Sequence, residues 1–277
     1  MKIIFVPVND RPECAIALKQ AFYLGNHLKA SVKGCHIRAH NDSDISFPIG
    51  ENFANDNELK HPEKNHSAKQ LFVKLAENKN FKFIKKQKNK PGALWLEKKG
   101  SPDKLFSIFG PVSDMIVVSR PIKKGKTLAR QFMMSAILKS AKPVLILPQT
   151  ETPEIGKTIS IAWNQSPQAA RAVAAAMPLL LLAKKVNIIT SRPENKVGPK
   201  AKHLIDYLRS WNIKAKHLVS DGKNDAQALL NGYEKTKSDL LVMGGYSHNR
   251  FKQHIFGGVT KYMLTEANIP IFMLYTK

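Results

Sequence analysis

Two glycine pairs late in the chain, Gly244-Gly245 and Gly257-Gly258, frame its most suggestive set of polar side chains. Glycine adopts positive φ readily and lets a ligand approach the backbone closely. A helix beginning at the second pair would offer free N–H groups and the positive end of its dipole to an anion such as phosphate. The pattern therefore predicts a site for a phosphate-bearing ligand. Nearby side chains that could donate to phosphate oxygens are Ser247, His248, Arg250 and Thr260.

Tight turns are the other interpretation of these glycines. Gly-Gly steps are weak signals by themselves, since connections between a strand and a helix often use positive φ. Whether the two glycine pairs indicate a ligand site or only tight turns depends on the strands and helices on either side of them.

Those elements repeat an earlier part of the chain. Residues 2–9 (Lys-Ile-Ile-Phe-Val-Pro-Val-Asn) correspond to residues 157–164 (Lys-Thr-Ile-Ser-Ile-Ala-Trp-Asn), 155 residues later. We therefore predict a duplicated unit, with one domain at residues 1–150 and a second at residues 151–277. Further matches pair residues 113–118 with 238–243 and residues 142–147 with 269–274.

After the apolar run at 115–118 and its match at 240–243, the two copies diverge. The first copy continues Ser119-Arg120-Pro121, whereas the second continues with Gly244-Gly245. Pro121 fixes φ and lacks an N–H where phosphate-facing amides would be needed. One glycine-rich loop in a duplicated fold predicts one working site, in the second copy, and a first copy that is structural.

Strand and helix patterns alternate along both copies. In the second copy Ser166 is suited to cap a helix, with Pro167 at the first helical position. Five strands joined by four helical crossovers require a parallel sheet covered on both faces, so the fold class is α/β. The first copy follows the same plan, with a long polar loop predicted at residues 41–67. The predicted strands of the second copy are 158–163, 186–190, 214–219, 240–243 and 271–275, and its helices 166–182, 200–211, 224–235 and 258–268.

Composition excludes several classes of protein. The longest apolar run, residues 172–183, contains Pro178 and is shorter than the roughly 20 residues of a membrane span. The first residues do not form a signal peptide, because Pro7 and the polar residues after it interrupt the apolar run. The 2 cysteines and the scattered histidines form no metal-ligand pattern. These features predict a cytoplasmic protein without a membrane segment or a metal site.

The formal net charge of +23 is the strongest compositional signal. It peaks at residues 79–99, where 8 lysines are interleaved with Phe81, Phe83 and Trp95 against the single Glu97. Cations beside aromatics suit a nucleic-acid surface. A solvated face would look similar, and lysine rather than arginine dominates, although arginine carries most base recognition. Nucleic-acid binding, where it occurs, is expected to be weak and indifferent to sequence.

Beyond these features, the chain resembles the universal stress proteins, in the arrangement with two such domains in tandem. The resemblance covers nearly the whole chain and is most specific in Trp163-Asn164 with residues 169–173, in residues 178–180 and in residues 242–260. Family members with nucleotide sites carry the motif Gly-x2-Gly-x9-Gly-Ser/Thr after the fourth strand. Gly244 and Gly257 fit this motif, and the spacing between them is preserved.

Three kinds of position depart from the family pattern. Ser247 stands where the second glycine of the motif belongs, and Gly258 stands where Ser or Thr belongs. The family's adenine-side aspartate, at the end of the first strand, is replaced by Asn9 in the first copy and by Asn164 in the second.

The resemblance implies two five-stranded domains of strand order 3-2-1-4-5, an adenine-nucleotide alpha-hydrolase-like fold. It also implies a pseudo-dimer in which the last strands, 144–147 and 271–275, pair antiparallel and cover each other's edges. Further assembly into a homodimer and binding of ATP or another adenine nucleotide are expected with it. The site residues expected in the second domain are Ala162, Trp163, Asn164, Gly244, Gly245, Ser247, His248, Arg250, Gly257, Gly258, Val259 and Thr260.

The sequence argues against a dedicated enzyme. It has no Gly-x-Ser-x-Gly elbow, no Walker A loop and no dinucleotide fingerprint, and slow incidental ATP hydrolysis stays open. Three hypotheses remain: a stress-response regulator with an adenine-nucleotide site, an interaction protein of the same fold that binds no nucleotide, and a polyanion-binding protein that uses residues 79–99.

Overall fold

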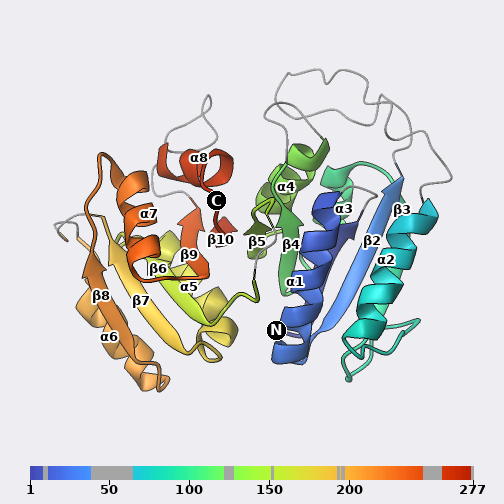
Figure 1. The fold of residues 1–277 in the computed structure, drawn as a ribbon, viewed down its shortest axis with the longest axis horizontal. Coiled ribbons are helices and arrows are strands. Elements are labelled where there is room, and N and C mark those ends of the chain that lie inside the picture. Colours follow the sequence, from blue (N-terminus) through green and yellow to red (C-terminus); the bar gives the residue numbers. More distant parts are fainter. Residues whose placement is uncertain are drawn as a thin grey trace. The chain divides into compact units, whose positions relative to one another are not determined.

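The structure is a computed structural model that describes residues 1–8, 12–38, 65–121, 128–150, 153–191, 194, 197–245 and 258–275. The chain divides into two compact units, Met1–Glu151 (unit 1) and Thr152–Lys277 (unit 2). Each is an α/β unit in which strands and helices alternate (Figure 1).

Unit 1 contains one parallel sheet in the order β3-β2-β1-β4-β5. Helix α1 packs beside α2, and α3 packs beside α4. The core is rich in aromatic side chains; Phe5, Phe22, Phe72 and Phe106 are all fully buried. Its elements are β1 (Ile3–Val8), α1 (Pro12–Leu28), β2 (Ser31–Arg38), α2 (Asn65–Asn78), β3 (Ala93–Lys99), α3 (Pro102–Phe109), β4 (Met115–Ser119), α4 (Leu128–Lys139) and β5 (Val144–Leu147).

Unit 2 repeats this plan in the order β8-β7-β6-β9-β10, again with every pairing parallel. The predicted order 3-2-1-4-5 is thus confirmed in both units; the pseudo-dimer and the homodimer stay predictions. The elements of unit 2 are β6 (Thr158–Ala162), α5 (Pro167–Leu180), β7 (Lys185–Thr190), α6 (Ala201–Ser210), β8 (Ala215–Val219), α7 (Asp225–Lys235), β9 (Leu240–Gly245), α8 (Gly258–Thr265) and β10 (Ile271–Tyr275).

Helix α5 begins as its sequence predicts. The hydroxyl of Ser166 accepts a hydrogen bond from the N–H of Ala169 at 3.2 Å, and Pro167 occupies the first helical position. A capping side chain satisfies one of the amides that a helix start leaves without an intrahelical partner.

Several predicted boundaries were wrong. The fourth strand of unit 2 does not end at residue 243: β9 continues through Gly244 and Gly245, which pair with Leu274 and Tyr275 of β10. Helix α8 ends at Thr265 rather than at residue 268, and a short connection follows it before β10. Within the predicted loop 41–67, residues from Asn65 on belong to α2, and residues 41–64 lie outside the described part.

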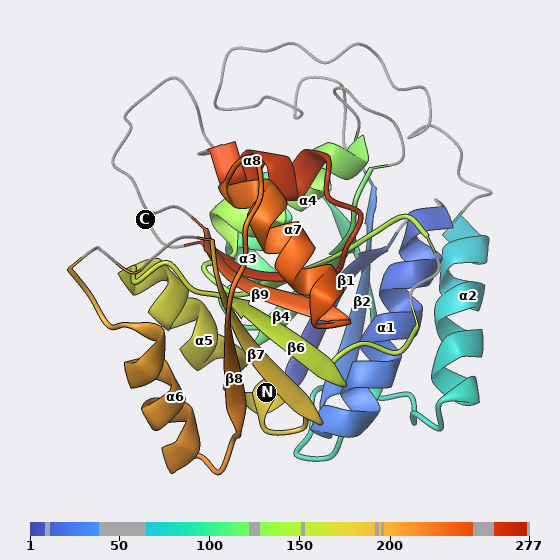
Figure 2. The ribbon, with the colours of Figure 1, turned by 60° about the vertical axis from the view of Figure 1, so that its left-hand side comes forward.

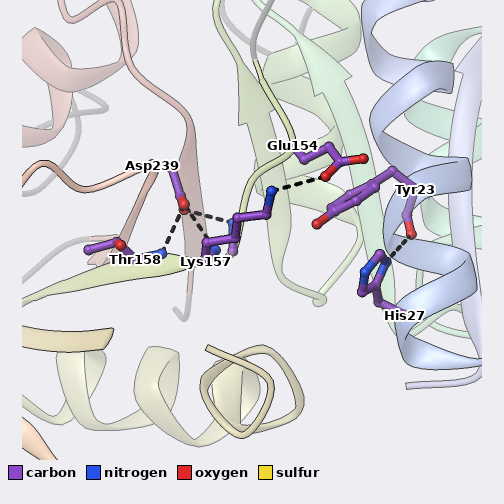
Figure 3. A network of polar contacts seen from close by, with 7 residues as sticks. Tyr23, His27, Glu154, Lys157, Thr158 and Asp239 are labelled. Atoms are coloured by element: carbon purple, nitrogen blue, oxygen red, sulfur yellow. Dashed lines mark hydrogen bonds and ion pairs between the residues drawn. The ribbon is translucent and has the colours of Figure 1, made fainter. Parts of the chain in front are cut away.

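An aspartate before the fourth strand joins that strand to the start of the first strand in each unit. The Asp239 carboxylate accepts hydrogen bonds from the backbone N–H groups of Gly156, Lys157 and Thr158 at 2.7, 2.9 and 2.8 Å (Figure 3). In unit 1 Asp114 accepts from the N–H groups of Lys2 and Ile3. The Ser-Asp repeat in the sequence therefore marks a structural tie made in both copies.

Candidate functional site

The candidate site lies at the carboxyl ends of β6 and β9 in unit 2. Strand β6 pairs in parallel with both β7 and β9, so the strand order reverses beside it. Figure 2 shows α5 and α6 on one side of this sheet and α7 and α8 on the other. Chains that leave neighbouring strands toward opposite faces open a crevice at the switch point, where open α/β sheets bind ligands.

At the end of β6, Ala162 and Trp163 are both buried. The Trp163 indole N–H donates to the backbone carbonyl of Pro199 at 2.8 Å, just before α6. Because side chains alternate along a strand and Ser160 faces Thr236 and Ser238 after α7, Trp163 projects toward the opposite face. Trp163 therefore anchors the β7–α6 connection over the end of β6, and its only donor is already used.

Asn164 follows Trp163 and is exposed. Its Oδ1 accepts from the Ser166 hydroxyl at 2.6 Å and from the Ser166 backbone N–H at 3.3 Å. A backbone N–H can only donate, so the atom that faces it must be the amide oxygen, which fixes the orientation of the side chain. The remaining Nδ2 group of Asn164 can offer a ligand hydrogen-bond donors and no acceptor.

Gln165 completes this turn, and the sequence analysis missed it. Its φ is +62°, an uncommon value for a residue other than glycine, and its side chain is buried. Its Nε2 donates to the carbonyl of Gly198 at 3.3 Å. A Cβ on Gly198, whose φ is +150°, would lie 2.5 Å from the Gln165 carbonyl oxygen. Gly198 thus permits the β6–α5 and β7–α6 connections to contact each other. In the sequence, only the Gly198-Pro199 step pointed to a special backbone conformation here.

At the end of β9 the two glycines differ. A Cβ on Gly244 would lie 2.5 Å from the carbonyl carbon of Gln168 and 2.7 Å from the amide nitrogen of Ala169, in the first turn of α5. A Cβ on Gly245 would meet its nearest atom at 3.4 Å, at the edge of ordinary contact. Packing against α5 therefore suffices to explain Gly244, as the structural interpretation proposed, whereas packing does not require Gly245.

The start of α8 is the open part of the site. Gly258 is exposed, and a Cβ placed on it would meet no atom of the described residues within 4 Å. Val259 is half-buried, whereas Thr260 is buried in the first turn. Among the described residues the Thr260 hydroxyl has no hydrogen-bond partner. The expected site residues that lie outside the described part of the chain are Ser247, His248, Arg250 and Gly257.

The corresponding position in unit 1 is filled by side chains. Ser119 and Arg120, which stand where unit 2 has Gly244 and Gly245, are both buried at the end of β4. Burial lowers the pKa of Arg120 to about 10, so the guanidinium still carries its charge at neutral pH. Unit 1 therefore has two buried polar side chains at the position where unit 2 has two glycines without side chains.

The carboxylates of Asp225 and Asp239 both lie away from the switch point. Asp225, in the first turn of α7, accepts a hydrogen bond from the Ser191 hydroxyl at 3.1 Å, beyond the end of β7. Asp239 lies at the opposite end of the sheet, where it accepts a hydrogen bond from the N–H of Thr158 at the start of β6. In the part of the chain that the structure describes, no cluster of His, Cys, Asp or Glu could hold a metal ion. No described helix is long and apolar enough to cross a membrane.

The whole chain is similar to solved structures of universal stress proteins. One, from Archaeoglobus fulgidus DSM 4304, is 13% identical, covers 99% of this chain and 98% of its own, and has a TM-score of 0.70. A protein of unknown function from Pseudomonas aeruginosa PAO1 is 13% identical over 99% of this chain and 92% of its own, with a TM-score of 0.59. A structure assigned to the universal stress proteins, from Pseudomonas aeruginosa UCBPP-PA14, gives 14% identity, 99% and 93% coverage and a TM-score of 0.59.

No family model matches the sequence, and a search of curated proteins gives no match either. At these identities the likeness to solved structures shows the fold. The chain has the two-unit fold of universal stress proteins, as the resemblance predicted, and each of the three matches spans both units.

Proposed function

We propose that this protein is a non-catalytic stress-response regulator whose unit 2 binds an adenine nucleotide, with ATP as the first candidate. The observation that carries the proposal is the open start of α8 at Gly258, at the end of the connection from β9. Free backbone N–H groups and the helix dipole favour phosphate at such a position. The hydroxyl of Thr260 adds a further group in the same turn.

Asn164 supports a ligand rich in acceptors. Its oxygen is used by Ser166, so only N–H donors remain for a ligand at the end of β6. Phosphate, ribose and ring-nitrogen acceptors of a nucleotide all suit such a donor.

The acidic residues support a binding role rather than a catalytic one. Phosphoryl transfer needs a metal ion beside the phosphates and a group that positions the nucleophile. The Asp239 carboxylate is used by three backbone amides at the other end of β6, and Asp225 is engaged by Ser191. Cytoplasmic location and assembly into a homodimer of the tandem chain belong to the same proposal.

Direct binding of ATP to the purified full chain tests the proposal. Equilibrium dialysis up to millimolar ATP, with and without Mg²⁺, should give saturable binding. Gly258→Leu should abolish this binding while the unfolding midpoint stays unchanged, because a Cβ at residue 258 would meet no atom of the described residues within 4 Å, whereas a larger side chain there obstructs the approach to the α8 amides. Unchanged affinity in Gly258→Leu would place the nucleotide elsewhere.

An interaction protein of the same fold that binds no nucleotide is the second candidate. The observation that favours it is Gly244, whose identity is explained by the close approach of α5 alone. No detectable binding by the parent protein at millimolar ATP would select this candidate.

A further inference from the structure

The amino end of the sheet in unit 1 carries a concentration of lysines. Parallel strands all begin at one end of a sheet, so the residues that precede β1, β2 and β3 gather there. Figure 1 shows the N-terminus and the α2–β3 connection at this end of the unit. Seven exposed lysines, which we name the amino-end lysines, are Lys2, Lys29, Lys82, Lys85, Lys86, Lys88 and Lys90.

The connection that bears five of these lysines is held in place. Gln87 donates from Nε2 to the Ser31 hydroxyl at 2.8 Å, which ties the middle of the connection to the start of β2. The N–H of Ile84 donates to the carbonyl of Ala93 at 3.0 Å, and the N–H of Ala93 donates to the carbonyl of Lys82 at 2.9 Å. The connection therefore presents its lysines from a defined backbone, which lowers the entropy lost on binding.

Aromatic packing anchors the same connection to the core. The Phe81 ring lies 5.1 Å from the ring of buried Phe22, and the Phe83 ring lies 6.0 Å from that of Phe72. At the end of the connection Gly92 packs closely against Ile84, since a Cβ on Gly92 would lie 2.8 Å from the Ile84 side chain.

Few acidic groups oppose these lysines. Asp114 lies at the same end, but its carboxylate accepts the backbone N–H groups of Lys2 and Ile3. Glu77 is exposed near the end of α2. Within the described ranges, no ion pair joins an amino-end lysine to a carboxylate. Their charge is thus available to an external anion.

We propose that the amino-end lysines form a contact surface for the phosphodiester backbone of nucleic acid, without preference for sequence. Backbone binding needs positive charge displayed against a regular row of phosphates. Base reading needs more: arginine forks or exposed aromatic faces. Phe81 is buried, the exposed Phe83 packs its ring against the ring of Phe72, and the Trp95 indole N–H already donates to Glu97 at 3.1 Å. The surface therefore suits phosphates and not bases.

Two variants that lose equal charge separate a local surface from the overall charge of +23. The first neutralises part of the connection, with Lys85, Lys86, Lys88 and Lys90 all changed to Gln. The matched control neutralises four exposed lysines of unit 2, with Lys202, Lys214, Lys216 and Lys223 changed to Gln. Unfolding midpoints of both variants are compared with the parent.

Binding is measured by fluorescence anisotropy with two unrelated DNA duplexes and a single-stranded RNA, from 50 to 200 mM salt. We expect the first variant to lose about tenfold or more in affinity, and its salt slope on duplex to flatten by up to about 3.6, or 0.9 for each of four phosphates. The control should stay within about threefold of the parent, and both duplexes should bind alike. The RNA arm tells whether both sources of a phosphodiester chain are accepted.

Equal losses in the two variants would overturn the proposal, because binding would then follow net charge alone. Absence of parent binding at 50 mM salt, or a strong preference between the two duplexes, would overturn it as well. Vesicles containing phosphatidylserine provide the last arm. Binding to these vesicles that depends on the same four lysines, with no binding to nucleic acid, would assign the surface to membranes instead.

Discussion

Units 1 and 2 share one sheet topology, yet the fourth strand ends differently in each. Strand β4 ends at Ser119, which is buried, as is Arg120 directly after it, whereas β9 ends in Gly244 and Gly245. The aspartate that ties the fourth strand to the start of the first is present in both units. Duplication has thus kept the parts that build the sheet, while the residues at the switch point have diverged.

The comparison also separates the two roles of glycine in unit 2. Gly244 is needed because a Cβ there would lie 2.5 Å from the backbone of Gln168 at the start of α5, whereas a Cβ on Gly258 would meet no atom of the described residues within 4 Å. Unit 1 has Ser119 at the position of Gly244, so the corresponding strand end there accommodates a Cβ. Glycines that packing does not explain, as at residues 245 and 258, are the evidence for a ligand.

The largest expected effect concerns Gly244. Gly244→Ser installs the residue of unit 1, and its Cβ would lie 2.5 Å from the Gln168 backbone, so α5 must shift. We expect the free energy of unfolding to fall by about 3 kcal/mol, the upper end of the usual cost of overpacking. Urea unfolding followed by circular dichroism measures it.

Gly258→Ser is the matched control for Gly244→Ser. The added side chain meets nothing within 4 Å, so stability should change by no more than about 0.5 kcal/mol. Similar stabilities of the two variants would contradict the distinction between the two glycines.

A smaller effect is expected from the aspartate ties. Asp239→Ala leaves three backbone amides without their acceptor, and Asp114→Ala leaves two. Hydrogen bonds to charged groups are individually strong, but these amides are partly exposed and water replaces some of the loss. We expect unfolding free energies to fall by about 2 kcal/mol for Asp239→Ala and about 1 kcal/mol for Asp114→Ala. Thermal unfolding of both variants measures the losses. A larger loss of stability in Asp114→Ala than in Asp239→Ala would contradict the prediction that the aspartate with three amide contacts contributes more.

The smallest effect concerns the hydroxyl of Thr260. Thr260→Val keeps the shape of the buried side chain and removes one hydrogen-bonding group, so ATP affinity should fall about fivefold, the equivalent of about 1 kcal/mol. Titration calorimetry measures this, with Ser135→Ala in α4 of unit 1 as the control that leaves affinity unchanged. Equal changes in both variants would remove Thr260 from the site.

Features that repeat along the chain could be predicted from sequence. The strand order, the helix cap at Ser166 and the elements of unit 2 follow from local patterns and from a resemblance that spans both copies. The extent of β9 could not be predicted, because Gly244 and Gly245 have weak strand propensity and are held by pairing with β10.

The candidate site was predicted less well, for a reason that is also physical. Trp163 stays a predicted site residue, but its buried indole donates to the carbonyl of Pro199, a contact that depends on a connection 36 residues away in sequence. The fixed orientation of Asn164 depends on the Ser166 hydroxyl and N–H. The order of the lysine-bearing connection depends likewise on tertiary contacts, among them the hydrogen bond from Gln87 to Ser31. Such contacts leave no periodic trace in a sequence.

Photolabelling with 8-azido-ATP tests the central claim, that only one of the two units binds nucleotide, most directly. After irradiation and proteolysis, we expect labelled peptides only from unit 2, residues 152–277, with protection by excess ATP and no label in Gly258→Leu. Protected labelling of peptides from unit 1, or equal labelling of the two units, would contradict the account.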